Sequence, residues 1–305
     1  MATPAVTFGV NIDPAHDYAT ALRLTRLAEE LGFDCALVQD HADNPRFVET
    51  WTLLAALGAA TERIVLGPNV LTSPLRLPAL IAKAAATLDL ITGGRVLLGL
   101  GAGASPEGIS ALGGPALPQP RDRFRAFRDT LHIVRGLWES DGEPFSHDGQ
   151  IHAVRNVRFG PLPSRRIPII TGAMGPRSLR LTAVLADGIS VSTPYVSAEQ
   201  LPAFRRRLDE GAREADRDPG ELRMIYNVMG FIDDGSSRLR PRNPGIYWGD
   251  AAWWVERLAS LVREAGVDGF IYWPVAGDYA DQFRRFATDV VPAVRASLRQ
   301  TAARP

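Results

Sequence analysis

Short apolar runs rich in β-branched residues alternate with helical segments along the whole chain, and this alternation limits the possible folds more than any other feature. The segments between the runs repeat apolar residues at helical spacing, as in residues 21–31 and 124–137. Strands that alternate with helices in this way form βαβ units with parallel pairing. Eight runs have the length and composition of strands, and they span residues 6–12, 35–39, 64–70, 96–101, 167–171, 188–193, 224–232 and 269–273.

Eight such units close naturally into a barrel, so the sequence predicts an α/β fold, the (β/α)₈ TIM barrel. Residues 144–159 contain Asp148-Gly149 between alternating residues, which predicts a hairpin inserted before strand 5. Residues 233–247 are rich in Gly, Pro, Ser and Arg, which predicts a long loop after strand 7 and a candidate lid. Neither stretch supplies a second core, so we expect residues 1–305 to form a single barrel domain.

Charge and cysteine content narrow the class of protein. Lys+Arg and Asp+Glu both number 34, so no basic excess favours nucleic acid as a partner. No stretch reaches the ~20 apolar residues that a membrane span needs, and no signal-peptide pattern opens the chain. The single cysteine, Cys35, excludes an internal disulfide. We therefore expect a soluble, cytoplasmic protein that binds neither nucleic acid nor membrane.

In a (β/α)₈ barrel the chemistry lies at the carboxyl-terminal ends of the strands. The second predicted strand ends in Asp40-His41. An imidazole at this place can act as an acid or base near neutral pH, with the carboxylate setting its tautomer. The alternative is a histidine that holds the loop through hydrogen bonds.

The third and fourth predicted strands end in an amide and in a glycine-rich turn. Asn69 is expected at the barrel mouth, where its amide could hold the edge of a ligand ring or satisfy the loop. The alternating glycines Gly99, Gly101 and Gly103 let the backbone approach a flat ligand closely. No helix is expected directly behind these glycines, as a dinucleotide-binding motif would require. Tight packing at the barrel top explains them equally well.

The fifth predicted strand leads into a helix start that favours an anion. Gly172 and Gly175 are followed by Pro176, which is typical of the first helical position. Free N–H groups and the helix dipole attract negative charge, and Arg177 adds a positive one. We interpret this turn as the candidate phosphate site; the alternative is an ordinary turn with a solvent-facing arginine. The five histidines show no metal-ligand spacing, so no metal is expected.

Taken in order along the chain, these motifs resemble the luciferase-like monooxygenase superfamily, which has the bacterial luciferase-like fold. Within it they resemble the F420-dependent oxidoreductase branch, which uses a deazaflavin coenzyme. The resemblance covers most of the chain from Phe8 to Thr193, and its specificity lies in the ensemble. The segments that carry it are residues 40–41, 53–67, 69–72, 78–89, 93–96, 99–103, 172–178 and 186–188.

The resemblance implies that the coenzyme ring lies across the barrel mouth, over a non-proline cis peptide at the bond between Asn69 and Val70. It also implies that the phosphate-bearing tail reaches the start of the helix after strand 5, and that the protein is a possible homodimer. The expected ring contacts come from Asp40, His41, Asn69, Val70, Thr72, Gly101, Gly103 and Ala104. The expected tail contacts come from Gly172, Ala173, Met174, Gly175, Arg177 and Ser178.

The resemblance further implies a reaction. Deazaflavin transfers hydride and does not activate oxygen, and the choice of F420 over FMN depends on Asp40-His41. Some relatives carry a glutamate as proton donor where this chain has Ala104. They also have a tryptophan shortly after the histidine, where this chain has residues 43–46, DNPR. His41 is therefore the expected proton donor or relay, with Asp40 orienting it.

We thus expect an F420-dependent oxidoreductase that passes hydride between the deazaflavin and a small, partly apolar organic substrate. The apolar character follows from four aromatic residues expected at the rim, namely Tyr195, Tyr247, Trp248 and Trp273. Two alternatives are an FMN-dependent luciferase-like monooxygenase and a non-catalytic protein that binds flavin or deazaflavin. A barrel hydrolase is disfavoured, because no pair of carboxylates lies at the predicted strand ends.

Overall fold

A single parallel sheet closes on itself in this protein, as the computed structural model shows for residues 6–172, 174–233, 241 and 243–302. The sheet contains ten strands, and a separate antiparallel hairpin contains two. The barrel strands are β1 (Thr7–Ile12), β2 (Cys35–Val38), β3 (Val65–Pro68), β4 (Leu71–Thr72), β5 (Leu98–Gly101), β8 (Ile169–Thr171), β9 (Gly188–Ser192), β10 (Arg223–Ile232), β11 (Tyr247–Gly249) and β12 (Gly269–Pro274). The hairpin strands are β6 (Phe145–Asp148) and β7 (Ala153–Val157).

The strands follow one another in the order β3-β2-β1-β12-β10-β9-β8-β5-β4, and β11 adds to β10. Closure occurs beside β3, where Leu66 pairs with Val96 in a parallel bridge. The Leu66 N–H donates to the Arg95 carbonyl at 2.9 Å, and the Leu97 N–H donates to the Leu66 carbonyl at 3.0 Å. Every main strand therefore has neighbours on both sides, as a barrel requires.

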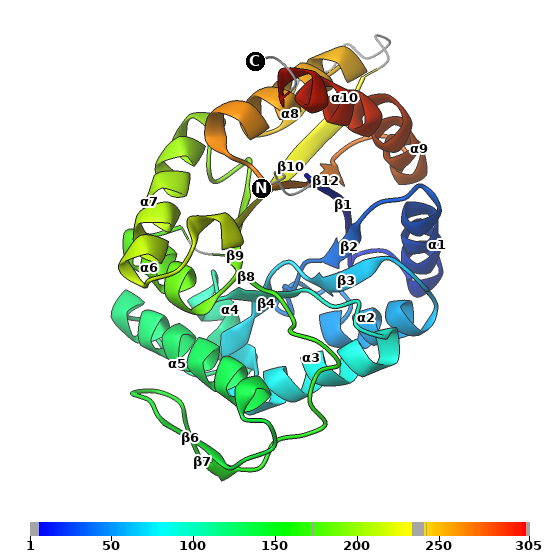
Figure 1. Ribbon diagram of the computed structural model, residues 1–305. Helices are drawn as coiled ribbons and strands as arrows, with labels where there is room; N and C mark the ends of the chain where they lie inside the picture. The colour runs from blue at the N-terminus through cyan, green and yellow to red at the C-terminus, as the bar shows by residue number, and fades with distance from the viewer. Residues whose placement is uncertain (1–5, 173, 234–240, 242, 303–305) are drawn as a thin grey trace.

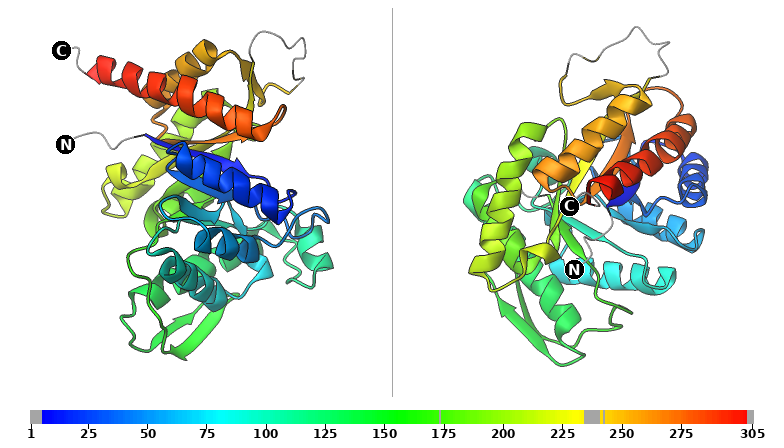
Figure 2. Two further views of the ribbon diagram at one scale, coloured as in Figure 1. Left: turned by 90° about the vertical axis from the view of Figure 1, so that its right-hand side faces the viewer. Right: turned by 45° about the horizontal axis from the view of Figure 1, so that its top comes forward.

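Helices surround the ring of strands, and the β6–β7 hairpin projects from the ring at the bottom of the view (Figure 1). In both views of Figure 2 the hairpin lies at the end of the molecule away from α8 and α10. The helices are α1 (Tyr18–Glu30), α2 (Thr50–Ala59), α3 (Pro78–Thr92), α4 (Pro106–Ala111), α5 (Pro120–Glu139), α6 (Pro176–Leu185), α7 (Leu201–Glu214), α8 (Ala251–Ala265), α9 (Tyr279–Arg285) and α10 (Val291–Ala302). Among the described helices, none is long and apolar enough to cross a membrane.

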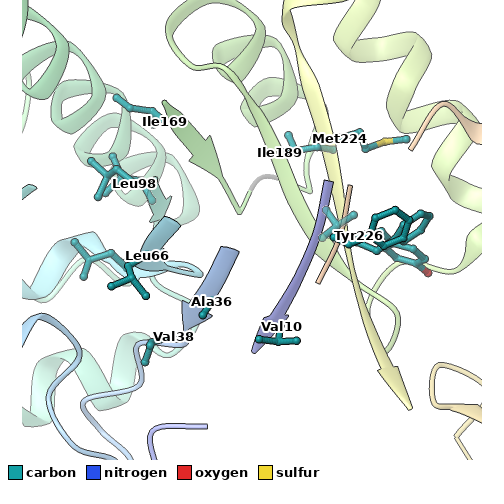
Figure 3. Packing of buried hydrophobic residues seen from close by; sticks show 14 of the residues in the cluster. Val10, Ala36, Val38, Leu66, Leu98, Ile169, Ile189, Met224 and Tyr226 are labelled. Atoms are coloured by element: carbon teal, nitrogen blue, oxygen red, sulfur yellow. The ribbon is translucent and has the colours of Figure 1, made fainter. Parts of the chain in front are cut away.

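Alternate residues of each strand face opposite sides, which produces two apolar layers. The outer layer packs between strands and helices, and Figure 3 shows part of it with Val10, Ala36, Val38, Leu66, Leu98, Ile169, Ile189, Met224 and Tyr226 labelled. The inner layer fills the barrel with Cys35, Leu37, Ile170, Ile225 and Ile271. The barrel is therefore plugged from within, and polar groups placed above this plug face the mouth.

The predicted barrel is confirmed, and so is the hairpin before strand 5. One predicted strand is interrupted: residues 64–70 divide into β3 and the start of a turn that leads to β4, because the chain bends at Asn69 and Val70. Of the expected lid, residues 234–240 and 242 lie outside the described part of the chain. Its far end forms β11, which pairs with β10 from Gly230 to Ile232.

Candidate active site

Polar side chains from β9, β10 and the turn after β3 meet inside the barrel beside the apolar plug. Asn69 Nδ2 donates to Asn227 Oδ1 at 2.7 Å, and Ser190 Oγ donates to Asn69 Oδ1 at 2.8 Å. Asn227 Nδ2 donates to the hydroxyls of Ser190 and Ser192, each at 3.0 Å. Sequence reasoning identified Asn69 but missed these partners. Each of these partners is a polar residue at an inward-facing position of an otherwise apolar strand, and this pattern could have identified them.

The amide of Asn69 therefore has a structural role, because its hydrogen bonds fix the chain at the end of β3. Both of its polar atoms already have protein partners, as is usual for buried amides. The peptide bond that follows, between Asn69 and Val70, is cis. This confirms what the family resemblance implied.

The half-buried side chain of Val70 points toward glycines of β5 and of the turn after β8. A Cβ atom at Gly101 would lie 2.8 Å from Val70 Cγ2, and one at Gly172 would lie 2.9 Å from the same atom. Both distances are shorter than a Cβ contact allows, so only glycine leaves room for Val70. At Gly101 the contact with Val70 supports the tight-packing alternative, and Gly172, predicted only as a tail contact, packs on Val70 as well. The result is an apolar platform that no side chain at positions 101 or 172 covers.

Asp40 has a different partner from the one predicted. Its carboxylate is buried and binds Arg76 through two contacts, Nη1 to Oδ2 at 2.7 Å and Nη2 to Oδ1 at 3.2 Å. The Thr72 N–H donates to Asp40 Oδ2 at 2.8 Å, and the Thr72 hydroxyl donates to the Asp40 carbonyl at 2.8 Å. The prediction that Asp40 orients His41 is therefore wrong, because both oxygens are engaged by Arg76 and Thr72.

Arg76 joins this aspartate to a second carboxylate. Its Nη2 donates to Glu49 Oε1 at 2.6 Å, and Glu49 also accepts the Thr52 N–H at the start of α2. Burial lowers the pKa of Arg76, but the two carboxylates outweigh it and raise the pKa overall. The guanidinium of Arg76 thus stays charged, and from the turn after β4 it binds both the end of β2 and the start of α2. We call this arrangement the Arg76 clamp. Sequence reasoning missed it, because Arg76 lies outside every motif.

The exposed side chain of His41 lies beside Asp43 and Phe47. Its side chain is 52% exposed, and its Nδ1 lies 4.0 Å from Asp43 Oδ1. The ring meets Phe47 edge to face at a centroid distance of 6.2 Å. An exposed imidazole can exchange its proton with water, which suits a proton relay.

Gly103 and Ala104 lie in the turn after β5, where Gly103 faces Ile109 and Pro74. Gly103 has a positive φ of 84°, which favours glycine. Contrary to expectation, a short helix follows at once: α4 begins at Pro106 and is capped by Ser105, whose hydroxyl accepts the Gly108 N–H at 3.1 Å. Ala104 is exposed. Because its side chain is a methyl group, this position brings no acidic group to the mouth.

The predicted phosphate site lies at the start of α6. Gly175 is the residue before this helix, Pro176 is its first residue, and no side chain caps it. Met174, Gly175 and Arg177 are exposed and Ser178 is partly buried, while Ala173 lies outside the described residues. Arg177 lines a cavity of about 270 Å³ beside Phe124 and Leu181, on the outer side between α5 and α6. Its guanidinium therefore adds positive charge near the start of α6, on the outer side of the barrel.

The four aromatic residues expected at the rim do not lie together. Tyr247 is buried in the outer layer, where its ring meets Trp254 of α8 at 5.7 Å, so its predicted place at the rim is wrong. Trp248 packs on Phe231 at 4.6 Å. Trp273 is half-buried and Tyr195 is 75% exposed. A polar cluster missed by sequence reasoning lies near Trp273 instead.

In that cluster, the Tyr279 hydroxyl donates to Asp13 Oδ2 at 3.5 Å, and the ring of His16 meets the Tyr279 ring edge to face at 5.0 Å. Burial and the negative charge of Asp13 raise the pKa of Tyr279 to about 12. Tyr279 therefore stays protonated at neutral pH and acts as a donor. Across the described ranges, no group of three or more His, Cys, Asp or Glu residues is arranged to hold a metal ion.

Comparison with known proteins shows which protein family the sequence matches. The sequence model of the luciferase-like monooxygenases matches residues 3–271. An F420-dependent glucose-6-phosphate dehydrogenase of Microbacterium testaceum is 32% identical over 212 residues, which cover 66% of this chain and 61% of that protein. A 5,10-methylenetetrahydromethanopterin reductase of Archaeoglobus fulgidus is 33% identical over 227 residues, covering 73% of this chain and 62% of that protein.

The chain thus spans less than two thirds of the length of these two relatives. Among solved structures, an F420-dependent secondary alcohol dehydrogenase in complex with an F420–acetone adduct superimposes with a TM-score of 0.81. It is 21% identical, and the superposition covers 95% of this chain and 99% of that one. At this identity the likeness shows the shared barrel fold.

Proposed function

Because the chain belongs to the luciferase-like monooxygenase family, we propose that it is an F420-dependent oxidoreductase acting on a small, partly apolar organic substrate. The observation that carries the proposal is the platform at the barrel mouth, formed by Val70 against Gly101 and Gly172. A flat ring needs an apolar surface with no side chain in the way. The F420-dependent relatives of this chain support the choice of cofactor.

The residues around the platform fit such a ring. Val70 is half-buried and offers an apolar face. Gly101 and Gly172 cannot cover it, and Ala104 extends the small-residue rim. Thr72 is held in place by its two hydrogen bonds to Asp40. The ring would thus lie on a surface that is fixed before binding, which lowers the cost of ordering it.

The tail of the cofactor would reach the start of α6. Phosphate binds well at an uncapped helix start, because the first N–H groups point outward and the dipole is positive there. Gly172, Met174, Gly175 and Ser178 would line this path, and Arg177 would add long-range attraction. Ala173, which lies outside the described residues, belongs to the proposed contact set.

Bound F420 would supply the hydride chemistry, and the chain would supply orientation and a proton path. We assign the proton to His41, which is exposed and can pass a proton between water and a substrate oxygen. In this proposal Asp40 does not bind the imidazole of His41. Asp40 binds Arg76 and Thr72 instead, and these contacts fix the end of β2 from which His41 projects.

An FMN-dependent monooxygenase is the second candidate, since the family model itself is named for monooxygenases and the platform would fit either ring. A fluorescence titration of the purified protein with F420 and with FMN separates the two. We expect saturable binding of F420 and weaker binding of FMN; the reverse order would refute the cofactor assignment.

The proton role has its own test. His41→Ala should lower kcat by roughly 10²–10⁴-fold, the range for loss of a general acid or base, and weaken F420 binding far less, because the other proposed ring contacts remain. Asp43→Asn is a matched control, because it changes the nearest carboxylate and keeps the imidazole. Turnover of His41→Ala at the wild-type rate would show that the proton takes another path.

We also propose a homodimer and a cytoplasmic location. The outer face of α3 exposes Leu80 at 59% and Ile91 at 49%, and Leu77, just before this helix, is 65% exposed. An exposed helix face of this composition supports burial against a second copy. Cys35 is buried, which raises its thiol pKa. Because Cys35 is the single cysteine of the sequence, no internal disulfide can form, and the fold needs no oxidising compartment.

A further inference from the structure

Asn11 in β1 is a buried amide without a partner. It is 1% exposed, and neither Nδ2 nor Oδ1 has a hydrogen-bond partner in the described part of the chain. Buried side-chain amides are nearly always paired, because an unpaired one keeps the full cost of losing water. The other two asparagines inside the barrel, Asn69 and Asn227, have partners on both polar atoms. Asn11 is the exception among these three.

The amide of Asn11 faces the inside of the barrel. Its strand neighbours Val10 and Ile12 belong to the outer apolar layer, so positions 9 and 11 face inward. A Cβ at Gly9 would lie 2.3 Å from Cys35 Sγ, within the inner plug. Asn11 is the next inward position toward the mouth, and it is in register with Leu37 at the edge of the plug.

Asn11 lies across the barrel from the proposed ring surface. Between β1 and β8 the ring of strands has β2, β3 and β5 on one side and β12, β10 and β9 on the other. The two strands are therefore opposite each other. Val70 points toward β5 and the turn after β8, so a ring lying on Val70 would leave Asn11 on the facing wall.

The neighbours of Asn11 on this wall are apolar. Val10 is in register with Tyr272, so the next inward residue of β12 is Trp273, and Met229 of β10 is in register with Trp273. The polar side chains Asn227 and Tyr279 on the neighbouring elements already have protein partners, so Asn11 offers the unpaired amide beside these apolar neighbours, which matches a partly apolar substrate with one polar group. An amide can donate to a carbonyl through Nδ2 and accept from a hydroxyl through Oδ1. It can therefore bind both members of a carbonyl/alcohol pair.

We propose that Asn11 is a substrate-binding residue that hydrogen-bonds the oxygen of a carbonyl or alcohol substrate, which places this chain among enzymes of that pair. The inference rests on the proposed function. Both amide atoms are shielded from solvent, so the substrate must take the place of side chains at the mouth when it binds.

The first test is stability without ligand. Asn11→Leu keeps the size of the side chain and removes an unpaired amide, so we expect its urea midpoint to equal or exceed that of the wild type. Asn227→Leu is the matched control: it removes three hydrogen bonds and should lower the midpoint clearly. A loss in Asn11→Leu as large as in Asn227→Leu would show a structural amide and overturn the proposal.

The second test separates substrate from cofactor. F420 affinity is measured by fluorescence, and the F420-loaded protein is then titrated with cyclohexanone and with methylenecyclohexane, which has the same shape without the oxygen. We expect F420 affinity of Asn11→Leu within about twofold of the wild type, and a loss of roughly tenfold in the preference for cyclohexanone, the effect of one hydrogen bond.

Three results would count against the proposal. A large loss of F420 affinity in Asn11→Leu would place the amide on the cofactor. An unchanged preference for cyclohexanone in the variant, or no preference in the wild type, would show that the amide does not meet the substrate. A wild-type protein that fails to bind F420 would refute the proposed function itself, and the titration shows this separately.

Discussion

Gly101→Ala tests most strictly how the barrel mouth is built. The new Cβ would lie 2.8 Å from Val70 Cγ2, and the backbone at Gly101 is not in the left-handed region. The cost therefore comes from the contact with Val70 and not from backbone strain. Overpacking of this kind lowers the free energy of unfolding by roughly 1–3 kcal/mol. Urea unfolding with linear extrapolation measures it.

Val70→Ala should remove that cost. Truncation takes away Cγ2, the atom that blocks position 101, and by itself costs about 1–2 kcal/mol for two partly buried methyl groups. In the Val70→Ala background, Gly101→Ala should then cost less than about 0.5 kcal/mol, which is a coupling of about 1–2 kcal/mol in the double-mutant cycle. Gly58→Ala, whose Cβ would approach Thr92 at 2.7 Å and not Val70, is the control without coupling. An equal cost of Gly101→Ala in both backgrounds would refute the packing argument.

Three further predictions concern stability and assembly. Arg76→Ala leaves the buried Asp40 without its cation and should lower the free energy of unfolding by roughly 3–5 kcal/mol, whereas exposed Arg63→Ala should change it little; equal effects in urea would contradict the clamp. Asp129 accepts the N–H groups of Ile151 and His152, which outweigh burial and lower its pKa. Its stabilisation is present above the unfolded pKa of about 3.9 and is lost as pH falls through the lower folded pKa, so the stability gap between wild type and Asp129→Asn should shrink below about pH 4; a constant gap would oppose this. Leu80→Arg should convert the proposed dimer to a monomer in light scattering. Leu112→Arg changes an exposed leucine directly after α4 and should leave the dimer intact.

The strand pattern predicted the barrel because each run carries its own signal. Apolar, β-branched residues bounded by turns identify a strand without knowledge of its neighbours. The interruption between β3 and β4 was not predicted, because residues 64–70 form one apolar run in the sequence. The hairpin was accessible through the turn at Asp148-Gly149.

Pairings between distant side chains were not accessible in the same way. Asp40 and His41 are adjacent in the sequence, but Asp40 binds Arg76, which lies 36 residues further along. The partners of Asn69 come from β9 and β10, more than 120 residues away. A sequence shows which residues could pair, and the choice among them depends on how the strands close. Tyr247 was misplaced for this reason, because the pairing of β11 with β10 turns it toward α8.

The central claim is hydride transfer through F420, and its most direct measurement is bleaching of F420 absorbance by substrate. Purified protein is loaded with F420 and mixed with a panel of alcohols, once under nitrogen and once under air. The account predicts bleaching at equal rates in both atmospheres, because deazaflavin hydride transfer needs no oxygen. Turnover that requires oxygen and FMN, with no bleaching of F420 under nitrogen, would contradict it.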